Sequence, residues 1–187
     1  LFALNYRKGI PDFAESTSDF DHLDFIFKHS FKVGVRGKVH FKANAGTFFN
    51  SNNIAPTDFK HFAGNQMVFT TSDPVGSFRL LPYYQYSTID NYAALSLHYQ
   101  FRKFLLTRIW EVQLLGIREN FFVNYLHTPR PSFETQENYV ELGYSLDNIL
   151  RFFRVELVTA FEDGKYFDLG VRIGIDCSLF GGLVSVE

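Results

Sequence analysis

Residues Asn138 to Asp176 read NYVELGYSLDNILRFFRVELVTAFEDGKYFDLGVRIGID, and apolar and polar residues alternate along three successive parts of this run. The apolar positions are Val140, Leu142, Tyr144 and Leu146, then Phe153, Val155, Leu157 and Phe161, and last Phe167, Leu169, Val171, Ile173 and Ile175. A period of two is typical of a β-strand, whose successive side chains point to opposite faces of a sheet. We therefore expect three strands, each with one apolar and one polar face.

Charged residues and glycines occupy the polar positions over about ten residues in each of these strands. A tilted strand needs about nine to eleven residues to cross the hydrocarbon of a bilayer, whereas strands of soluble proteins usually have about five or six. The pattern therefore predicts an all-β chain that forms part of an antiparallel transmembrane β-barrel, with its polar faces lining an aqueous lumen.

Similar alternation upstream of Asn138 predicts about eight meandering strands in a partial barrel. Besides the three strands above, the expected strand segments are residues 1–10, 20–33, 35–45, 66–71, 78–87, 92–102 and 111–125, the last as two short strands or one strand bent at Gly116. Pro82 is tolerated in a strand only at an edge, a bulge or a strand end. We expect residues 47–65 to form the longest loop, on the outer side of the membrane, because periplasmic turns are short. Residues 104–110 are expected to form an apolar connection with a turn of interfacial helix.

Charge falls on the polar phase of the clearest strands, as a membrane wall requires, because an Arg or Lys on the lipid face costs about 2–4 kcal/mol at the midplane. The predicted lumen-facing polar network is Arg36, Lys38, Arg102, Glu141, Arg154, Glu156, Asp168 and Arg172. The predicted lipid-facing residues are Leu95, Leu97, Val140, Leu142, Val155, Leu157, Val171 and Ile173. A water-soluble sheet whose apolar faces pack together separates charge in the same way. A soluble β-barrel or sandwich that binds a small apolar ligand is therefore the alternative.

The composition of the 187-residue chain limits which binding partners and which structural classes we expect. Its formal net charge is -2, which gives no reason to expect a nucleic-acid partner. Aromatic residues make up 18%, as expected for strands and for the aromatic girdles of outer-membrane barrels. Cys177 is the single cysteine, so an internal disulfide and a cysteine cluster for zinc are excluded. No run approaches the roughly 18 apolar residues of a membrane helix.

Catalytic and metal-binding motifs are weak. His22, His40 and His98 share the polar phase of their strands, but no His-x-His or His-x-x-x-His spacing supports a metal site. No Gly-x-Ser-x-Gly motif appears. We expect no cofactor, no metal and no enzymatic activity; a barrel-embedded hydrolase using Ser96 and His98 is the weaker third hypothesis.

Six short motifs resemble a known family. They are FKHFAGNQ at residues 59–66, LPYYQYST at 81–88, NYLHTP at 124–129, YVELGY at 139–144, FRVE at 153–156 and GVRIGI at 170–175. Together they resemble the C-terminal half of a family of Gram-negative outer-membrane proteins that carry a carboxypeptidase-regulatory-like domain ahead of a barrel. The layout is more distantly similar to the barrel of the bacterial surface antigen superfamily, which inserts or translocates outer-membrane and secreted proteins. The Arg-Gly-Phe or Arg-Gly-Tyr tip of that superfamily is replaced here by Phe62-Ala63-Gly64-Asn65.

The resemblance implies a bacterial outer-membrane location and a structural or transport role, with assembly or export of other proteins by analogy. The implied partners are outer-membrane lipid, N-terminal barrel strands of the same protein, and outer-membrane or secreted proteins. We expect residues 1–176 to be the C-terminal part of the barrel and residues 177–187 to be a tail. The chain opens at Leu1 without a leader, so we expect a fragment of a longer protein.

Overall fold

The computed structural model describes residues 1–11, 18–34, 37–64, 66, 68–70, 76–101, 103–129 and 136–175. Its strands are β1 (Phe2–Gly9), β2 (Asp19–Val33), β3 (Gly37–Asn53), β4 (Phe69–Thr70), β5 (Tyr92–Phe101), β6 (Arg118–His127), β7 (Asn138–Ile149), β8 (Phe153–Glu162) and β9 (Lys165–Ile175). The short helices are η1 (Pro56–Asp58), η2 (Leu106–Arg108) and α1 (Trp110–Leu114). Within the described residues, no helix has the length and hydropathy needed to cross a membrane.

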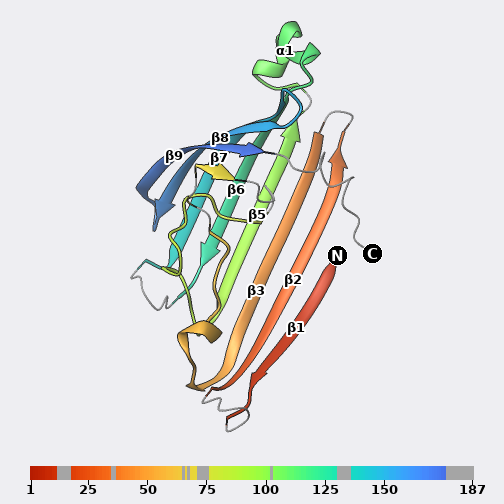
Figure 1. Ribbon diagram of the computed structural model, residues 1–187. Helices are drawn as coiled ribbons and strands as arrows, with labels where there is room; N and C mark the ends of the chain where they lie inside the picture. Colours follow the sequence, from red (N-terminus) through yellow and green to blue (C-terminus); the bar gives the residue numbers. More distant parts are fainter. Residues whose placement is uncertain are drawn as a thin grey trace.

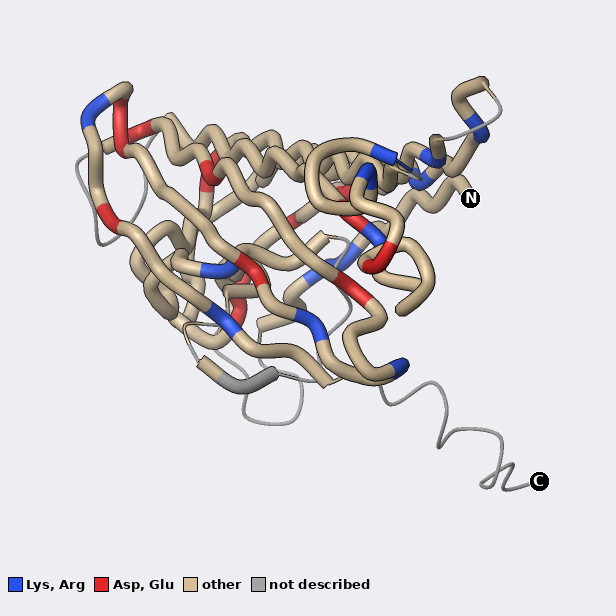
Figure 2. Tube along the Cα trace, turned by 90° about the horizontal axis from the view of Figure 1, so that it is seen from above, with Lys and Arg blue, Asp and Glu red and all other residues tan. Residues whose placement is uncertain are grey.

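All the strands belong to one sheet in the order β1-β2-β3-β5-β6-β7-β8-β9-β4 (Figure 1). Eight strands are antiparallel neighbours, and the two-residue strand β4 pairs in parallel with β9. The prediction of an all-β chain with about eight meandering antiparallel strands is confirmed. The sheet does not close on itself; seen from above, it bends into an open trough (Figure 2).

Tight turns connect the last strands. Asp163 and Gly164 join β8 to β9 with φ angles of 44° and 77°. Two consecutive positive φ angles define a type I′ turn, whose twist matches that of a hairpin, and Asp-Gly is a favoured pair for it. The register of β8 and β9 shifts close to this turn. Ala160 pairs with Asp168 and Phe161 pairs with Tyr166, which leaves Phe167 as an extra residue in β9. This bulge interrupts the alternation of β9, and the Phe167 ring contacts Tyr139 at a centroid distance of 6.3 Å.

Between β3 and β5, the described part of the chain lies on the concave face of the sheet; we call residues 54–64, 66, 68–70 and 76–91 the inner segment (Figure 1). Bridges from Lys60 to Thr88 and from Gly64 to Phe78 hold its two arms together. Its strand β4 crosses to the far edge of the sheet, where Phe69 pairs with Ile173 of β9. The hydrophobic core lies between this segment and the sheet and consists of Phe78, Leu80, Leu81, Tyr86, Phe122, Leu126, Tyr139, Val158 and Ala160.

Three expectations about these elements were wrong. Residues 78–87 form no strand, because Pro82 cannot donate to a ladder and the backbone of Arg79 and Leu80 binds a side chain instead. The loop expected at residues 47–65 begins later, because β3 continues to Asn53 and pairs with β2 up to Asp19. Upstream of β6, the chain forms α1 and turns at Gly116 (φ 71°), in place of a strand from residue 111.

Candidate functional site

Burial is inverted with respect to a soluble sheet. On the concave face, the ionisable residues Glu141, Glu156 and Arg172 are 0%, 1% and 3% exposed. On the convex face of neighbouring strands, Leu157 and Val171 are 49% and 56% exposed. Isolated exposed apolar residues are common on soluble proteins, whereas buried charges are rare unless they are paired. The ionisable residues of these strands are therefore on the inner face, beside the hydrophobic core, and the aliphatic residues of the outer face are exposed.

Glu156 of β8 lies at the centre of a buried charge cluster on the concave face. Its carboxylate is 3.0 Å from Nε of Arg154, 3.5 Å from Nε of Arg79 and 3.9 Å from Nη1 of Arg172. These are ion pairs by distance, because neither Glu156 oxygen has a hydrogen-bond partner among the described residues. The Arg79 guanidinium also lies 4.1 Å from the centre of the Phe122 ring. One carboxylate thus offsets part of the charge of three guanidinium groups, one of which comes from the inner segment.

Glu141 of β7 binds the backbone of the inner segment. Its carboxylate accepts hydrogen bonds from the N–H groups of Arg79, at 2.8 and 2.9 Å, and of Leu80, at 2.7 Å. The side chains of Asn124 and Tyr139 donate two more, at 3.1 and 2.9 Å. Hydrogen bonds to an ionised acceptor are roughly twice as strong as neutral ones. Glu141 therefore holds the returning arm of the inner segment against β6 and β7.

A second polar cluster holds the other arm of the inner segment against β2. Lys60 donates a 2.7 Å hydrogen bond to Asp24, and the hydroxyl of Tyr92 donates to the same carboxylate oxygen. Tyr92 also lies 3.0 Å from Nε2 of His22, whose Nδ1 contacts the Arg7 guanidinium. Asp24 and Glu141 thus tie the inner segment to opposite sides of the trough.

The predicted lumen-facing residues are only partly brought together. Glu141, Arg154, Glu156 and Arg172 are buried within the same concave region. Lys38 is exposed near the end of the trough that carries α1. Asp168 is exposed and does not join the Glu156 cluster, because it stands opposite Ala160, four residues along β8 from Glu156 and closer to the β8–β9 turn. Arg36 and Arg102 lie outside the described residues, as does the tail expected from residue 177.

The eight predicted lipid-facing residues lie on the convex face. Leu95, Leu97, Val155, Leu157 and Val171 are exposed, and Val140, Leu142 and Ile173 are half-buried. Where the described strands cross the middle of the trough, the convex face has no second protein layer over it. His29, which interrupts the apolar phase of β2, stacks between Phe27 and Phe31, with ring centroids 6.2 and 5.7 Å apart.

An apolar projection stands at one end of the sheet; we call residues 103–117 the foot. Its exposed large side chains are Phe104, Leu105, Leu106, Ile109, Trp110, Leu114 and Leu115. Glu119 at the start of β6 holds the foot, because its carboxylate accepts hydrogen bonds from the backbone N–H groups of Phe104, Leu105 and Leu106. The expected interfacial helical turn at residues 104–110 corresponds to η2 and the start of α1.

Sequence reasoning missed Lys60, Arg79 and Glu119. Lys60 and Arg79 lie in the irregular inner segment, where no periodicity shows which way a side chain points. Glu119 occupies a position of β6 at which the alternation predicts an apolar residue. This exception to the pattern was the signal that could have marked Glu119 as a functional residue.

The three histidines on the polar phase of their strands do not all meet in the structure. The rings of His40 and His98 lie 6.1 Å apart across β3 and β5, whereas His22 contacts Tyr92. Among the described residues, no group of three or more His, Cys, Asp or Glu side chains is arranged to hold a metal ion. Ser96 and His98 are both buried on the concave face of β5, and the His98 ring packs on Phe122.

Comparison with known proteins places most of the chain in a family. The model of the family described as "Family of unknown function (DUF5686) C-terminal domain" matches residues 1–146, which include β1 to β6 and most of β7. No curated protein and no solved structure matches the chain. A match over more than three quarters of the sequence, together with the all-β fold, places the chain in a family: it belongs to the DUF5686 family, as a C-terminal domain of that family.

Proposed function

We propose that this chain forms part of the wall of a bacterial outer-membrane β-barrel, with the convex face against lipid and the concave face toward an aqueous lumen. The observation that carries the proposal is the inverted burial: Glu141 and Glu156 are enclosed, while Leu157 and Val171 are exposed. In water, exposed aliphatic side chains on successive long strands leave apolar surface unburied at about 25 cal/mol for each Å². In a bilayer the same surface is solvated by acyl chains.

Strand length supports the same proposal. β5 to β9 have 10 to 12 residues each, which matches the length that a tilted strand needs to cross the hydrocarbon. The foot adds an exposed tryptophan and several leucines at one end of the strands. Trp residues concentrate at membrane–water interfaces, so the foot fits the boundary between lipid and water.

Barrel closure requires further strands. β1 has β2 on one side and, among the described residues, no strand on the other, whereas the β9 edge is covered over only two residues by β4. Unpaired backbone groups in lipid cost several kcal/mol each, so open edges do not persist in a membrane. We infer that strands outside this chain pair with β1 and with the rest of β9.

The inner segment gives the barrel wall a filled interior over β6 to β8. Such a filling narrows a lumen, so the proposed role is structural or transport-related, with passage dependent on movement of the inner segment. Assembly or export of outer-membrane or secreted proteins follows by analogy with the bacterial surface antigen superfamily and rests on fold-level likeness alone.

Detergent dependence tests the membrane proposal. We expect the purified chain to be monodisperse with β-sheet circular dichroism in detergent micelles or lipid nanodiscs, and to aggregate when detergent is removed. A chain that stays folded and monodisperse in plain buffer would overturn the proposal and favour the soluble ligand-binding barrel. No single observation in the described residues favours that second candidate, because their concave face is filled by the inner segment and by paired charges.

A further inference from the structure

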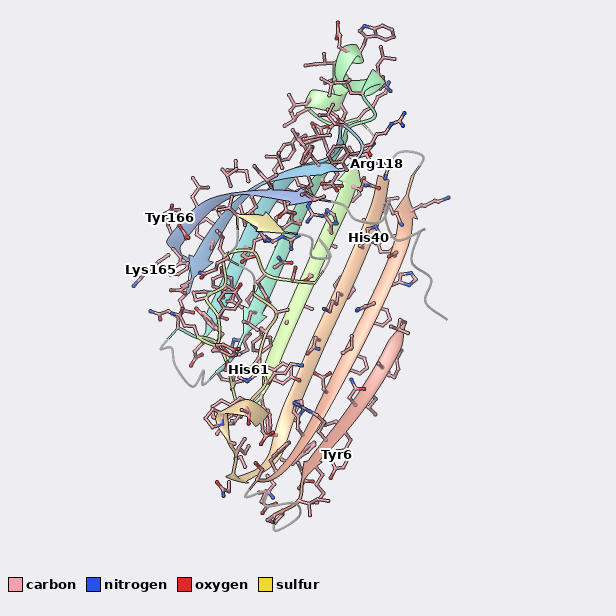
Figure 3. All side chains as sticks on the ribbon, viewed as in Figure 1. Tyr6, His40, His61, Arg118, Lys165 and Tyr166 are labelled. Atoms are coloured by element: carbon pink, nitrogen blue, oxygen red, sulfur yellow. The ribbon has the colours of Figure 1, made fainter. Side chains whose placement is uncertain are left out.

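A groove of about 800 Å³ lies at the rim of the trough, where the foot meets the ends of β2, β3 and β5; we call it the basic groove. Four cationic residues line it, namely Lys32, Lys38, Lys103 and Arg118, and no carboxylate is among the described residues of the lining. Figure 3 shows Arg118 beneath α1, and Lys165 on the β8–β9 hairpin at the far edge of the sheet. The residues that line the basic groove include no member of the buried Glu156 cluster, so the two sites are distinct.

The basic groove concentrates positive charge that the chain offsets only in part: Arg118 stands opposite Asp147 in the β6–β7 register, whereas Lys38 stands between Lys32 and Gln100. Lys32 and Lys38 stand directly opposite each other in the β2–β3 register. Like charges in that position destabilise a strand pair. Within the part of the chain that the structure describes, none of the four cations forms a salt bridge. A bound anion would remove this repulsion.

The surroundings of the basic groove are apolar. Phe101 and Ile117 contribute to its lining, and so do Gln113 and Gly116 of the foot. Leu114 and Leu115, which lie between Gln113 and Gly116, are 66% and 62% exposed. An anion-binding groove beside exposed leucines matches the chemistry of an amphiphile with a negatively charged head and an apolar tail.

We propose that the basic groove binds the phosphorylated headgroup of a lipid whose acyl chains lie along the foot. Lys and Arg form charge-assisted hydrogen bonds to phosphate oxygens, and Arg118 supplies the planar guanidinium that can bind two of them. The inference rests on the proposed membrane location, because acyl chains must be available beside Leu114 and Leu115. It adds a headgroup preference that a barrel wall by itself does not require.

Trp110 on the foot is the single tryptophan of the chain and is exposed, so its fluorescence reports contact between the foot and lipid. The chain is reconstituted in nanodiscs of phosphatidylcholine that contain brominated-chain phosphatidylglycerol, or brominated-chain phosphatidylcholine at the same mole fraction. We expect stronger quenching of Trp110 by the brominated phosphatidylglycerol. The double variant K38Q/K103Q should reduce this preference by about fivefold for each cation removed.

Lys165→Gln is the matched control, because it removes an exposed lysine far from the groove. It should leave the preference unchanged. Equal quenching by the two brominated lipids, or a preference that survives K38Q/K103Q, would overturn the headgroup proposal while leaving the membrane proposal standing. Absence of quenching by either lipid would instead overturn the membrane location of the foot. Loss of the preference in inorganic phosphate, but not in chloride of equal ionic strength, would identify a soluble phosphate as the occupant and overturn the lipid assignment.

Discussion

The Glu141 carboxylate on β7 accepts two hydrogen bonds, at 2.8 and 2.9 Å, from the backbone N–H of Arg79, a residue 62 positions earlier in the chain. The Arg79 side chain extends from the same point to Glu156 on β8. Arg79 therefore joins the inner segment to two neighbouring strands, once through its backbone and once through its guanidinium.

Glu141→Ala should release the returning arm of the inner segment. The substitution leaves the buried N–H groups of Arg79 and Leu80 without an acceptor, at a cost of about 1–3 kcal/mol for each group. Amide hydrogen exchange at these two residues should accelerate, and the free energy of unfolding in urea should fall. Glu137→Gln, an exposed substitution just before β7, is the control and should change neither quantity. Unchanged exchange at Arg79 in Glu141→Ala would contradict the anchoring role.

Glu156→Gln should destabilise the fold by about 3–5 kcal/mol, because it leaves buried guanidinium groups without their shared counter-charge. Urea unfolding in detergent, followed by circular dichroism, measures the loss. Asp168→Asn removes an exposed acid from the adjacent strand and should stay within about 0.5 kcal/mol of the parent chain. Similar losses for the two variants would show that Glu156 does not balance the cluster.

Leu157→Arg should show whether the convex face contacts lipid or water. Leu157 on β8 is 49% exposed, and Leu150 in the β7–β8 turn is 68% exposed, so in water an arginine is tolerated at either position. In a bilayer, an arginine on the outer face costs about 2–4 kcal/mol near the midplane and little near the interface. We expect Leu157→Arg to fold poorly into lipid vesicles and Leu150→Arg to fold normally. Equal folding yields would contradict the membrane orientation.

Glu119→Ala should loosen the foot. The carboxylate of Glu119 accepts backbone hydrogen bonds from Phe104, Leu105 and Leu106, so its loss frees the start of the foot from β6. The fluorescence anisotropy of Trp110 should fall, while the circular dichroism of the sheet stays the same. Glu111→Gln changes an exposed acid on α1 itself and should leave the anisotropy unchanged. A fall of equal size in the control would mean that Glu119 has no special role.

Asp163 in the β8–β9 turn should make stability depend on pH. Hydrogen bonds from the Asn138 side chain, and from the backbone N–H groups of Asn138 and Glu137, lower the pKa of the Asp163 carboxyl. A lowered pKa means that this stabilisation is complete above the unfolded-state value, about 3.9, and is lost as the pH falls through the folded-state value. Unfolding free energies measured between pH 6 and pH 3 should therefore decline less steeply in Asp163→Asn. An identical decline in both proteins would contradict this contribution.

Periodicity in the sequence was enough to predict the all-β class, the long antiparallel strands and, with Glu119 of β6 as an exception, the face of each clear strand on which charged residues fall. Strands such as β7 and β8 were predictable because a side-chain period of two follows directly from extended backbone geometry. Glu141, Arg154, Glu156 and Arg172 could accordingly be placed on one face before any coordinates. The family match extends over residues 1–146, so of the Glu156 cluster it includes Arg79 but not Arg154, Glu156 or Arg172.

Tertiary structure alone decided what occupies the concave face. The inner segment has no repeating pattern, so nothing local shows that Arg79 meets Glu156 or that Lys60 meets Asp24; these contacts depend on how far the sheet bends. Asp168 stands on the same face as Arg172 but opposite Ala160, four residues along β8 from Glu156, and the polar phase alone does not show which of its members the inner segment covers. Alternation along a strand follows from the local geometry of the extended backbone. The pairing of charges that are distant in sequence depends instead on how the inner segment packs against the sheet.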